Sequence, residues 1–373
     1  MLYQTYLAPG EKQLLARFWQ SASGFWRGPS AWRAWLLVAV LIATVLLQLL
    51  TQYALNYWNR DFFNAIGRKD GVELWTQALR FVPLAAASLT LTVFSVWARM
   101  TMQRTWRAWL SNHLYDYWLK DDRHLQLKSA AADHQAPEFR IAEDARIATD
   151  LPVDLVLGLF QSLLNAVTFI GILWSVGDGL AIDLGGFVLN IPGYLVVAVI
   201  TYSALLSAGI FLIARHLTRV MEENKRAEAE LRSTGTHLRE SGEGTAVPDG
   251  KKDARHVIGA PLKAVINIWR IYMWQLMRMT VVTYSSLLVT PVIGLLLCTP
   301  KYLAGTMSLG EVVQAAAAFV VVQGAFSWFT DNYARLAEWA SSANRVASLL
   351  LALDEIDQPD RTKDAAPPAS SGR

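Results

Sequence analysis

Charged residues at helical spacing form two clusters that are better suited to coupling movements than to catalysis. Arg140, Glu143 and Asp144 lie three and four residues apart, which allows an Arg–Glu or Arg–Asp pair within one helix. By spacing alone, a solvated helix face is favoured over a coupling site by roughly two to one. A second cluster of the same kind consists of Arg239, Glu240 and Glu243.

Polar residues within or beside apolar stretches form another set of candidates, for a transport path. Arg278 lies in a long apolar run, where a charge is costly unless it faces a wet cavity or a partner. Snorkelling toward the interface, near Arg270 and Trp274, is an equally good interpretation. Gln314 and Gln323 could line a path or only bond between helices. The full set of path candidates is Arg278, Gln314, Gln323 and Asp331.

The sequence shows no catalytic or metal-binding pattern. The six histidines are scattered, Cys298 is the single cysteine, and neither a nucleophile elbow nor a zincin helix is present. A phosphate-cradling loop requires G-x-x-x-x-G-K-[ST]. The segment Gly244–Lys252 is one residue too long and has Lys252 where a hydroxyl is needed. We therefore expect no catalytic residue, metal or cofactor in this chain, and no ATPase of its own.

The composition predicts a membrane protein that crosses the bilayer several times. Of its 373 residues, 53% are hydrophobic and 17% charged, and the mean hydropathy is +0.25. The net charge of +3 suggests no nucleic acid partner. Apolar windows long enough to span a bilayer occur at Trp32–Tyr53, Ala78–Met100, Leu155–Trp174, Pro192–Ala214, Trp274–Cys298 and Val312–Thr330.

Lysine and arginine are sparse in alternate connections and dense in the others, which places both termini in the cytoplasm. Before the first span, residues 11–21 form an amphipathic pattern that we interpret as an elbow helix on the inner leaflet. A helix from Pro137 to Trp174 would be about 55 Å long against roughly 30 Å of hydrocarbon, so half of it stands outside the membrane. A similar extension follows the fourth span. The two resulting hairpins have predicted tips near Ser129–Ala136 and Gly244–Lys252.

Several local segments, and their order along the chain, resemble those of a known protein family. The segment "APEFRIAEDARIATD", residues 136–150, resembles the first-loop motif of ABCD-type ABC transporters, which include YddA-like bacterial proteins. The segments "LRESGEGTA" (238–246) and "NYWNRDFFNAI" (56–66) resemble the second loop and the first external segment of that group. The segment at 323–346 resembles its sixth span and exit helix, and the whole also resembles SbmA/BacA-like peptide-uptake proteins. Departures from the pattern occur at Ala136, Phe139 and residues 247–253.

The resemblance implies an all-α fold with six transmembrane helices, assembled as a homodimer in the lipid bilayer of a bacterial inner membrane. It also implies import of a bulky substrate, such as a peptide or a cobalamin-like compound, by alternating access. ATP and magnesium would act only through a separate nucleotide-binding subunit docked on the loop tips. One alternative is a proton-driven SbmA/BacA-like permease, for which Asp154 and Glu311 are the nearest membrane acids. A second alternative is a non-transporting scaffold or decayed half-transporter.

The expected domain organisation has four parts. Residues 1–30 form a cytoplasmic segment with the elbow helix, and residues 31–333 form the six-helix membrane domain. Residues 334–356 form a cytoplasmic exit helix. Residues 357–373, rich in proline, serine and alanine, form a disordered tail that cannot build a core.

Overall fold

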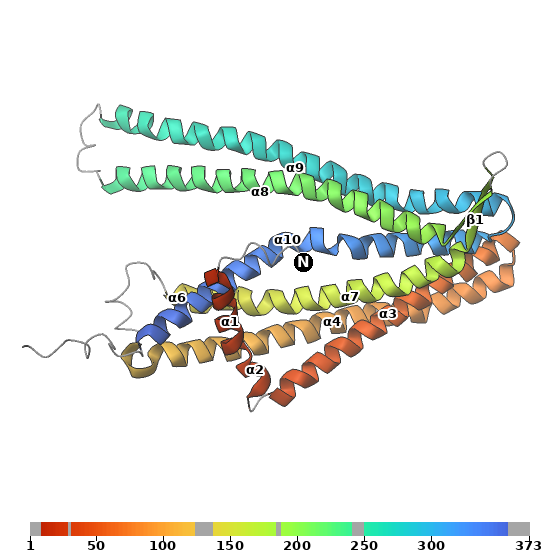
Figure 1. Ribbon diagram of the computed structural model, residues 1–373, viewed down its shortest axis with the longest axis horizontal. Helices are drawn as coiled ribbons and strands as arrows, with labels where there is room; N and C mark the ends of the chain where they lie inside the picture. The colour runs from red at the N-terminus through yellow and green to blue at the C-terminus, as the bar shows by residue number, and fades with distance from the viewer. Residues whose placement is uncertain (1–8, 29–30, 124–136, 184–187, 241–249, 357–373) are drawn as a thin grey trace, which may run out of the picture. The chain divides into compact units, whose positions relative to one another are not determined.

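The computed structural model describes residues 9–28, 31–123, 137–183, 188–240 and 250–356. Six helices in this part of the chain are long and apolar enough to cross a membrane, which confirms the predicted number of spans and the all-α fold (Figure 1). They contain the predicted apolar windows, except that the fourth window begins two residues before its helix, at Pro192, and they extend well beyond the windows. The long helices are α3 (Ala31–Arg68), α4 (Gly71–Leu119), α7 (Ala145–Gly177), α8 (Tyr194–Glu240), α9 (Gly250–Leu303) and α10 (Leu309–Ile356).

The chain divides into two compact units, and the long helices α3, α7 and α10 pass from one to the other. The first unit contains residues 1–58, 72–165 and 331–373. Its buried cluster includes Met102 and Trp106 from α4 and Leu350 from α10. It also includes Ile141, which lies in the turn just before α7. The second unit contains residues 59–71 and 166–330.

The elbow consists of α1 (Pro9–Ala22) and α2 (Gly24–Arg27). Phe18 and Phe25 are each 1% exposed and belong to the buried cluster of the first unit. The face containing Phe18, which we expected on the leaflet, therefore packs on the protein itself. The physical reason is that the neighbouring helices of the first unit already offer Phe18 an apolar surface.

The first hairpin extension enters the membrane as one helical run that begins at α6 (Pro137–Phe139). Pro137 stands at its first position, where its missing N–H costs nothing. A π-helical turn, η2 (Arg140–Asp144), follows and leads into α7. Such turns are often found at functional sites because they locally widen the helix and redirect its side chains.

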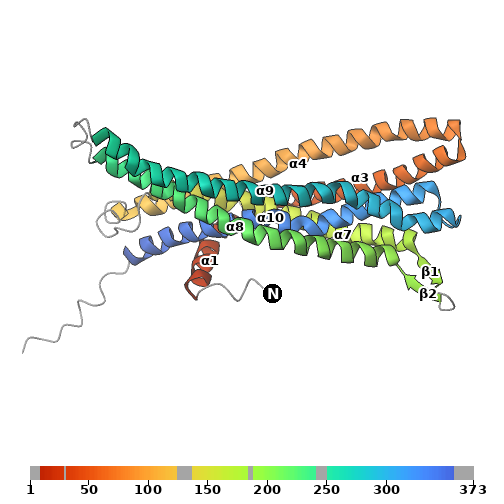
Figure 2. The ribbon, with the colours of Figure 1, turned by 90° about the horizontal axis from the view of Figure 1, so that it is seen from above.

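The second hairpin extension is formed by α8 and α9, which lie side by side in both views (Figures 1 and 2). Between α7 and α8 the chain forms a two-stranded antiparallel hairpin, β1 (Gly179–Asp183) with β2 (Val188–Pro192), in which Leu180 pairs with Ile191. These strands are not predicted from the sequence, because five residues are too few for a periodic pattern to be recognised.

Several predictions concern residues outside the described part of the chain. These are the first hairpin tip at Ser129–Ala136, residues 244–249 of the second tip, Glu243 and the tail at 357–373. The start of the N-terminal segment, residues 1–8, lies outside it as well.

Candidate functional site: the α7–α10 ladder

Polar contacts join the start of the first extension to the C-terminal half of α10. We call them the α7–α10 ladder, defined by the pairs Arg140–Ser348, Asp144–Arg345 and Asp154–Arg335. Ten residues separate Asp144 from Asp154, and ten separate Arg335 from Arg345. Each interval corresponds to about 15 Å of helix rise, so two antiparallel helices bring both pairs into register.

The Asp144–Arg345 pair is the most enclosed rung of the ladder. The Asp144 side chain is 1% exposed, whereas the Arg345 side chain is 45% exposed. Arg345 donates from Nε to both carboxylate oxygens at 2.9 Å and from Nη2 to Oδ1 at 2.6 Å. Ser341 and Ser342 accept further hydrogen bonds from the guanidinium, at 2.6 and 2.8 Å. The guanidinium is therefore held in one orientation toward Asp144.

Small side chains explain how the two helices come close enough for this pair. Ala145, Ala148, Ala343 and Ala347 are all fully buried in the same cluster. Alanine at such positions lets helix backbones approach closely. Thr149 is also fully buried, and its hydroxyl donates to the Ala145 carbonyl of its own helix at 2.9 Å. The polar contacts of the ladder thus border a buried interface of small side chains.

The Asp154 rung carries more partners than the Asp144 rung. Arg335 Nη2 donates to Asp154 Oδ2 at 2.7 Å, and Gln103 Nε2 donates to Oδ1 at 2.9 Å. Arg99 Nε lies 3.5 Å from the same Oδ1. Asp154 therefore connects α7 to both α4 and α10, and its charge is balanced by two arginines.

A further ion pair attaches the elbow helix to the end of α10. Arg17 donates from Nε and Nη2 to the two oxygens of Asp354 at 2.7 and 2.8 Å. The Tyr117 hydroxyl donates to the same carboxylate, and the Arg123 guanidinium lies 4.3 Å from the centre of the Tyr117 ring. The hydrogen bond to Asp354 raises the pKa of Arg17 above its ordinary value, although burial opposes the charge. This ion pair therefore links the elbow helix α1 to the last turn of α10.

The first predicted cluster is present, but its members pair differently from the expectation. Arg140 donates to Ser348 Oγ at 3.0 Å, and Glu143 pairs with Arg146 at 2.5 Å. Asp144 pairs with Arg345. The intrahelical pairs expected for Arg140 are thus replaced, because the wider turn η2 and the neighbouring α10 offer each group another partner. In the second cluster, Arg239 and Glu240 are exposed in the last turn of α8.

The four path candidates have four different surroundings. Arg278 is exposed on α9, and Asp331 is exposed on α10. Gln314 is 1% exposed inside the second unit. Gln323 donates to Ser327 Oγ of its own helix at 2.7 Å. The described contacts therefore explain Gln323 as a helix contact and leave a path function for Arg278 and Asp331 as a prediction.

The sequence analysis missed Arg335 and Arg345. A signal for them was nevertheless present. Asp144 and Asp154 are ten positions apart on one helical run, and Arg335 and Arg345 are ten positions apart on another. If the two runs pack antiparallel, each aspartate meets one arginine. Helical spacing offers Asp144 partners only within its own helix.

The six long, apolar helices define a helical membrane protein that crosses the bilayer several times. A model of the family described as ABC transporter transmembrane region 2 matches residues 28–303. The chain therefore belongs to this family. The family membership confirms the resemblance drawn from residues 56–66 and 136–150 as far as the ABC class.

Curated relatives agree with this assignment. The chain is 27% identical over 348 residues to the inner membrane ABC transporter ATP-binding protein YddA of Escherichia coli, covering 90% of this chain and 60% of that protein. It is 26% identical to an uncharacterised ABC transporter ATP-binding protein of Synechocystis, covering 89% and 49%. It is 20% identical to ABC transporter D family member 2, chloroplastic, of Arabidopsis thaliana, covering 90% and 45%. The chain thus spans about half the length of the relatives it matches.

Proposed function

We propose that the chain forms the membrane part of a homodimeric ABC transporter in a bacterial inner membrane. It imports bulky compounds, such as peptides or cobalamin-like molecules, by alternating access. ATP hydrolysis with magnesium is supplied by a nucleotide-binding partner that docks on the cytoplasmic ends of the helices. Family membership and the similarity to proteins named as ATP-binding support an ATP-driven mechanism.

The α7–α10 ladder is the observation that carries the proposal. Its two ion pairs lie about 15 Å apart along both helices, so α7 and α10 cannot slide or rotate against each other without breaking one of them. A force applied at η2, beside the first hairpin tip, therefore moves both helices together. Such a rigid pair is suited to transmit a docking event to the membrane spans.

The proton-driven alternative depends on acids that could bind and release protons near the membrane. Glu311 accepts hydrogen bonds from the Ser308 backbone N–H at 2.7 Å and from its hydroxyl at 2.9 Å. Ser308 and Glu311 thus form a capping box at the start of α10. Asp154 is held by Arg335. Both acids have structural partners, which favours ATP as the energy source.

Vesicle uptake with a peptide and cobalamin panel tests the energy source. We expect uptake to require ATP and the nucleotide-binding partner, and to be absent with an imposed proton gradient alone. Uptake driven by the gradient without ATP or a partner would instead establish the SbmA/BacA-like alternative. Failure of both drives with correctly folded protein would favour the scaffold.

A pair of charge-reversal variants tests whether the partner docks near η2. Glu143 has a side chain that is 40% exposed, so Glu143→Lys should fold normally while weakening ATP-driven uptake. Glu222→Lys is the matched control, because Glu222 is also exposed but lies 18 residues before the end of α8 at Glu240. Equal uptake by the two variants would show that the surface around η2 is not a docking site.

A further inference from the structure

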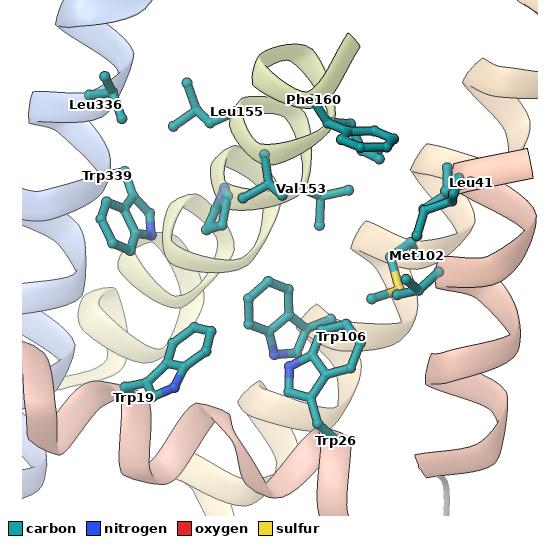
Figure 3. Close-up of a pocket in the computed structure, with 15 residues that line it drawn as sticks. Trp19, Trp26, Leu41, Met102, Trp106, Val153, Leu155, Phe160, Leu336 and Trp339 are labelled. Carbon is teal, nitrogen blue, oxygen red and sulfur yellow. The ribbon is translucent and has the colours of Figure 1, made fainter. Parts of the chain in front are cut away.

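A cavity of about 500 Å³ lies beside the elbow helices, within the first unit (Figure 3). We call it the elbow cavity. Its lining includes Trp19 and Trp26 from the elbow, Met102 from α4, Val153 from α7 and Trp339 from α10. All the surface that these residues present to the cavity is apolar. This volume lies within the range of about 300–1,000 Å³ that is typical of small-molecule sites.

The apolar lining restricts what can fill the elbow cavity. Water is a poor occupant, because it requires polar partners and apolar cavities remain dry. An unfilled space of this size would also leave its lining atoms without packing contacts. A flexible hydrocarbon chain satisfies both conditions.

The position of the elbow cavity along the helices places it at one membrane interface. Met102 and Trp106 stand just after the apolar window of the second span, and Val153 stands just before that of the third. Val38 and Leu41 lie within the first three turns of the first window. The spans containing these residues therefore meet the cavity at the same end. Tryptophan gathers at such boundaries, where acyl chains meet headgroups.

Part of the lining of the elbow cavity is exposed. We call Trp19, Ile42 and Val156 its rim, because they line the cavity and are 55%, 38% and 66% exposed. In a bilayer placed on the apolar windows, exposed apolar side chains at this level would face lipid. A lipid chain could then enter sideways from the surrounding leaflet.

A cation lies beside the elbow residues of the cavity. Arg27 follows Trp26 and is exposed, so it offers a positive charge for a lipid phosphate outside the apolar lining.

From these observations we infer that the elbow cavity holds one acyl chain of a membrane phospholipid. The inference depends on the placement of the spans in a bilayer and not on the direction or energy source of transport. The phospholipid fills the space between the elbow, α3, α4, α7 and α10, and so joins the elbow to the helices of the ladder.

Photo-cross-linking tests this inference directly. The full chain is placed in vesicles of phosphatidylethanolamine and phosphatidylglycerol that contain a phospholipid with a diazirine in its acyl chain. After illumination, mass spectrometry maps the labelled residues. We expect adducts on the cavity-lining residues, Val153 and Met102 among them.

Two valine variants on α7 separate the cavity from ordinary lipid contact. Val156→Trp fills the rim and should remove most of the cavity adducts. Val167→Trp is the matched control, because Val167 is 73% exposed on the same helix but does not line the cavity. The inference is overturned if cavity adducts are absent in the unmodified chain, or if Val156→Trp leaves them unchanged.

A second copy of the chain could cover the rim instead of lipid. Cys298 is fully buried, so Val156→Cys provides a single accessible thiol. We expect no disulfide-linked dimer under mild oxidation. Efficient formation of that dimer would show that another copy closes the cavity and would overturn the inference.

Discussion

The two hairpin extensions are long helical structures of the same kind, but different interactions hold them. The first extension is fixed to α10 by ion pairs, with Asp144 completely enclosed. In the described part of the second extension, α8 and α9 contact each other through apolar side chains, with Val220 and Val265 4% and 5% exposed, and Trp269 donates to the Glu228 carboxylate at 3.4 Å. Where the two helices enter their apolar windows, Gln275 donates to the Ile213 carbonyl at 3.0 Å.

The difference shows how one fold can combine a rigid element with a compliant one. A buried ion pair has a strongly preferred geometry, and loss of either partner leaves an uncompensated charge. Apolar contacts are less directional and tolerate small shifts between helices. We therefore expect the first extension to move as one rigid body with α10. We expect α8 and α9 to shift slightly against each other. Variants in each extension should reveal this contrast.

The largest effect is expected from Arg345→Ala. It leaves the Asp144 carboxylate buried without its partner, which typically costs about 3 kcal/mol in the free energy of unfolding. The partial exposure of Arg345 places the expected value at the lower end of the range for buried pairs. Thermal unfolding in detergent, with Arg239→Ala as control, measures the loss. A difference below about 1 kcal/mol would contradict a stabilising role for the rung.

A double variant sharpens this result. Replacing both partners with apolar residues, as in Asp144→Leu with Arg345→Met, removes the buried charge together with its cation. Such replacements are often neutral, so the double variant should recover most of the stability that Arg345→Ala loses. If the double variant is stable but its ATP-driven uptake is reduced, the Asp144–Arg345 pair transmits movement between α7 and α10 as well as stabilising the fold. Full uptake in the double variant would restrict its role to stability.

Asp154→Asn should have an intermediate effect. The asparagine can still accept from Gln103 or Arg335, but it no longer balances the two arginines. We expect a loss of about 1–2 kcal/mol, as is usual for hydrogen bonds to charged groups. Comparison with Asp150→Asn on the same helix, measured by the same unfolding assay, controls for the general loss of a carboxylate. An effect equal to that of Arg345→Ala would show that the two rungs contribute equally.

Gln275→Ala tests how firmly α8 and α9 are held together. The variant removes a neutral hydrogen bond from a side chain that is 5% exposed, and the Ile213 carbonyl lies within a helix. We expect a loss of about 1 kcal/mol, smaller than that of either charged rung. A larger loss would mean that α8 and α9 are held as firmly as α7 and α10, and the contrast would fail.

The smallest effect on stability is expected from Arg239→Ala combined with Glu240→Ala. Both residues are exposed in the last turn of α8, so unfolding should shift by no more than about 0.5 kcal/mol. If the second tip docks the nucleotide-binding partner, ATP-driven uptake should nevertheless fall. Unchanged uptake would remove these two residues from the coupling candidates.

The number of spans and the helical extensions could be predicted from the sequence because both depend on local properties. A window of about 20 apolar residues is sufficient to identify a span. The helical run from Pro137 also followed from local signals, although the π-helical turn at Arg140–Asp144 did not. The β1–β2 hairpin was missed because its strands are too short for a periodic pattern.

Tertiary structure decided which partner each charge has. Spacing offered Asp144 a neighbour within its own helix, but its actual partner, Arg345, is 201 residues away. The enclosed position of Asp144 depends on fully buried alanines such as Ala145 and Ala343, and no local pattern records that packing. The elbow cavity likewise exists only where six helices meet. The sequence by itself determined the helices and their membrane windows, because hydrophobicity and helix propensity act over a few turns. Ion-pair partners and cavities required the folded chain, because they depend on groups that are distant in sequence.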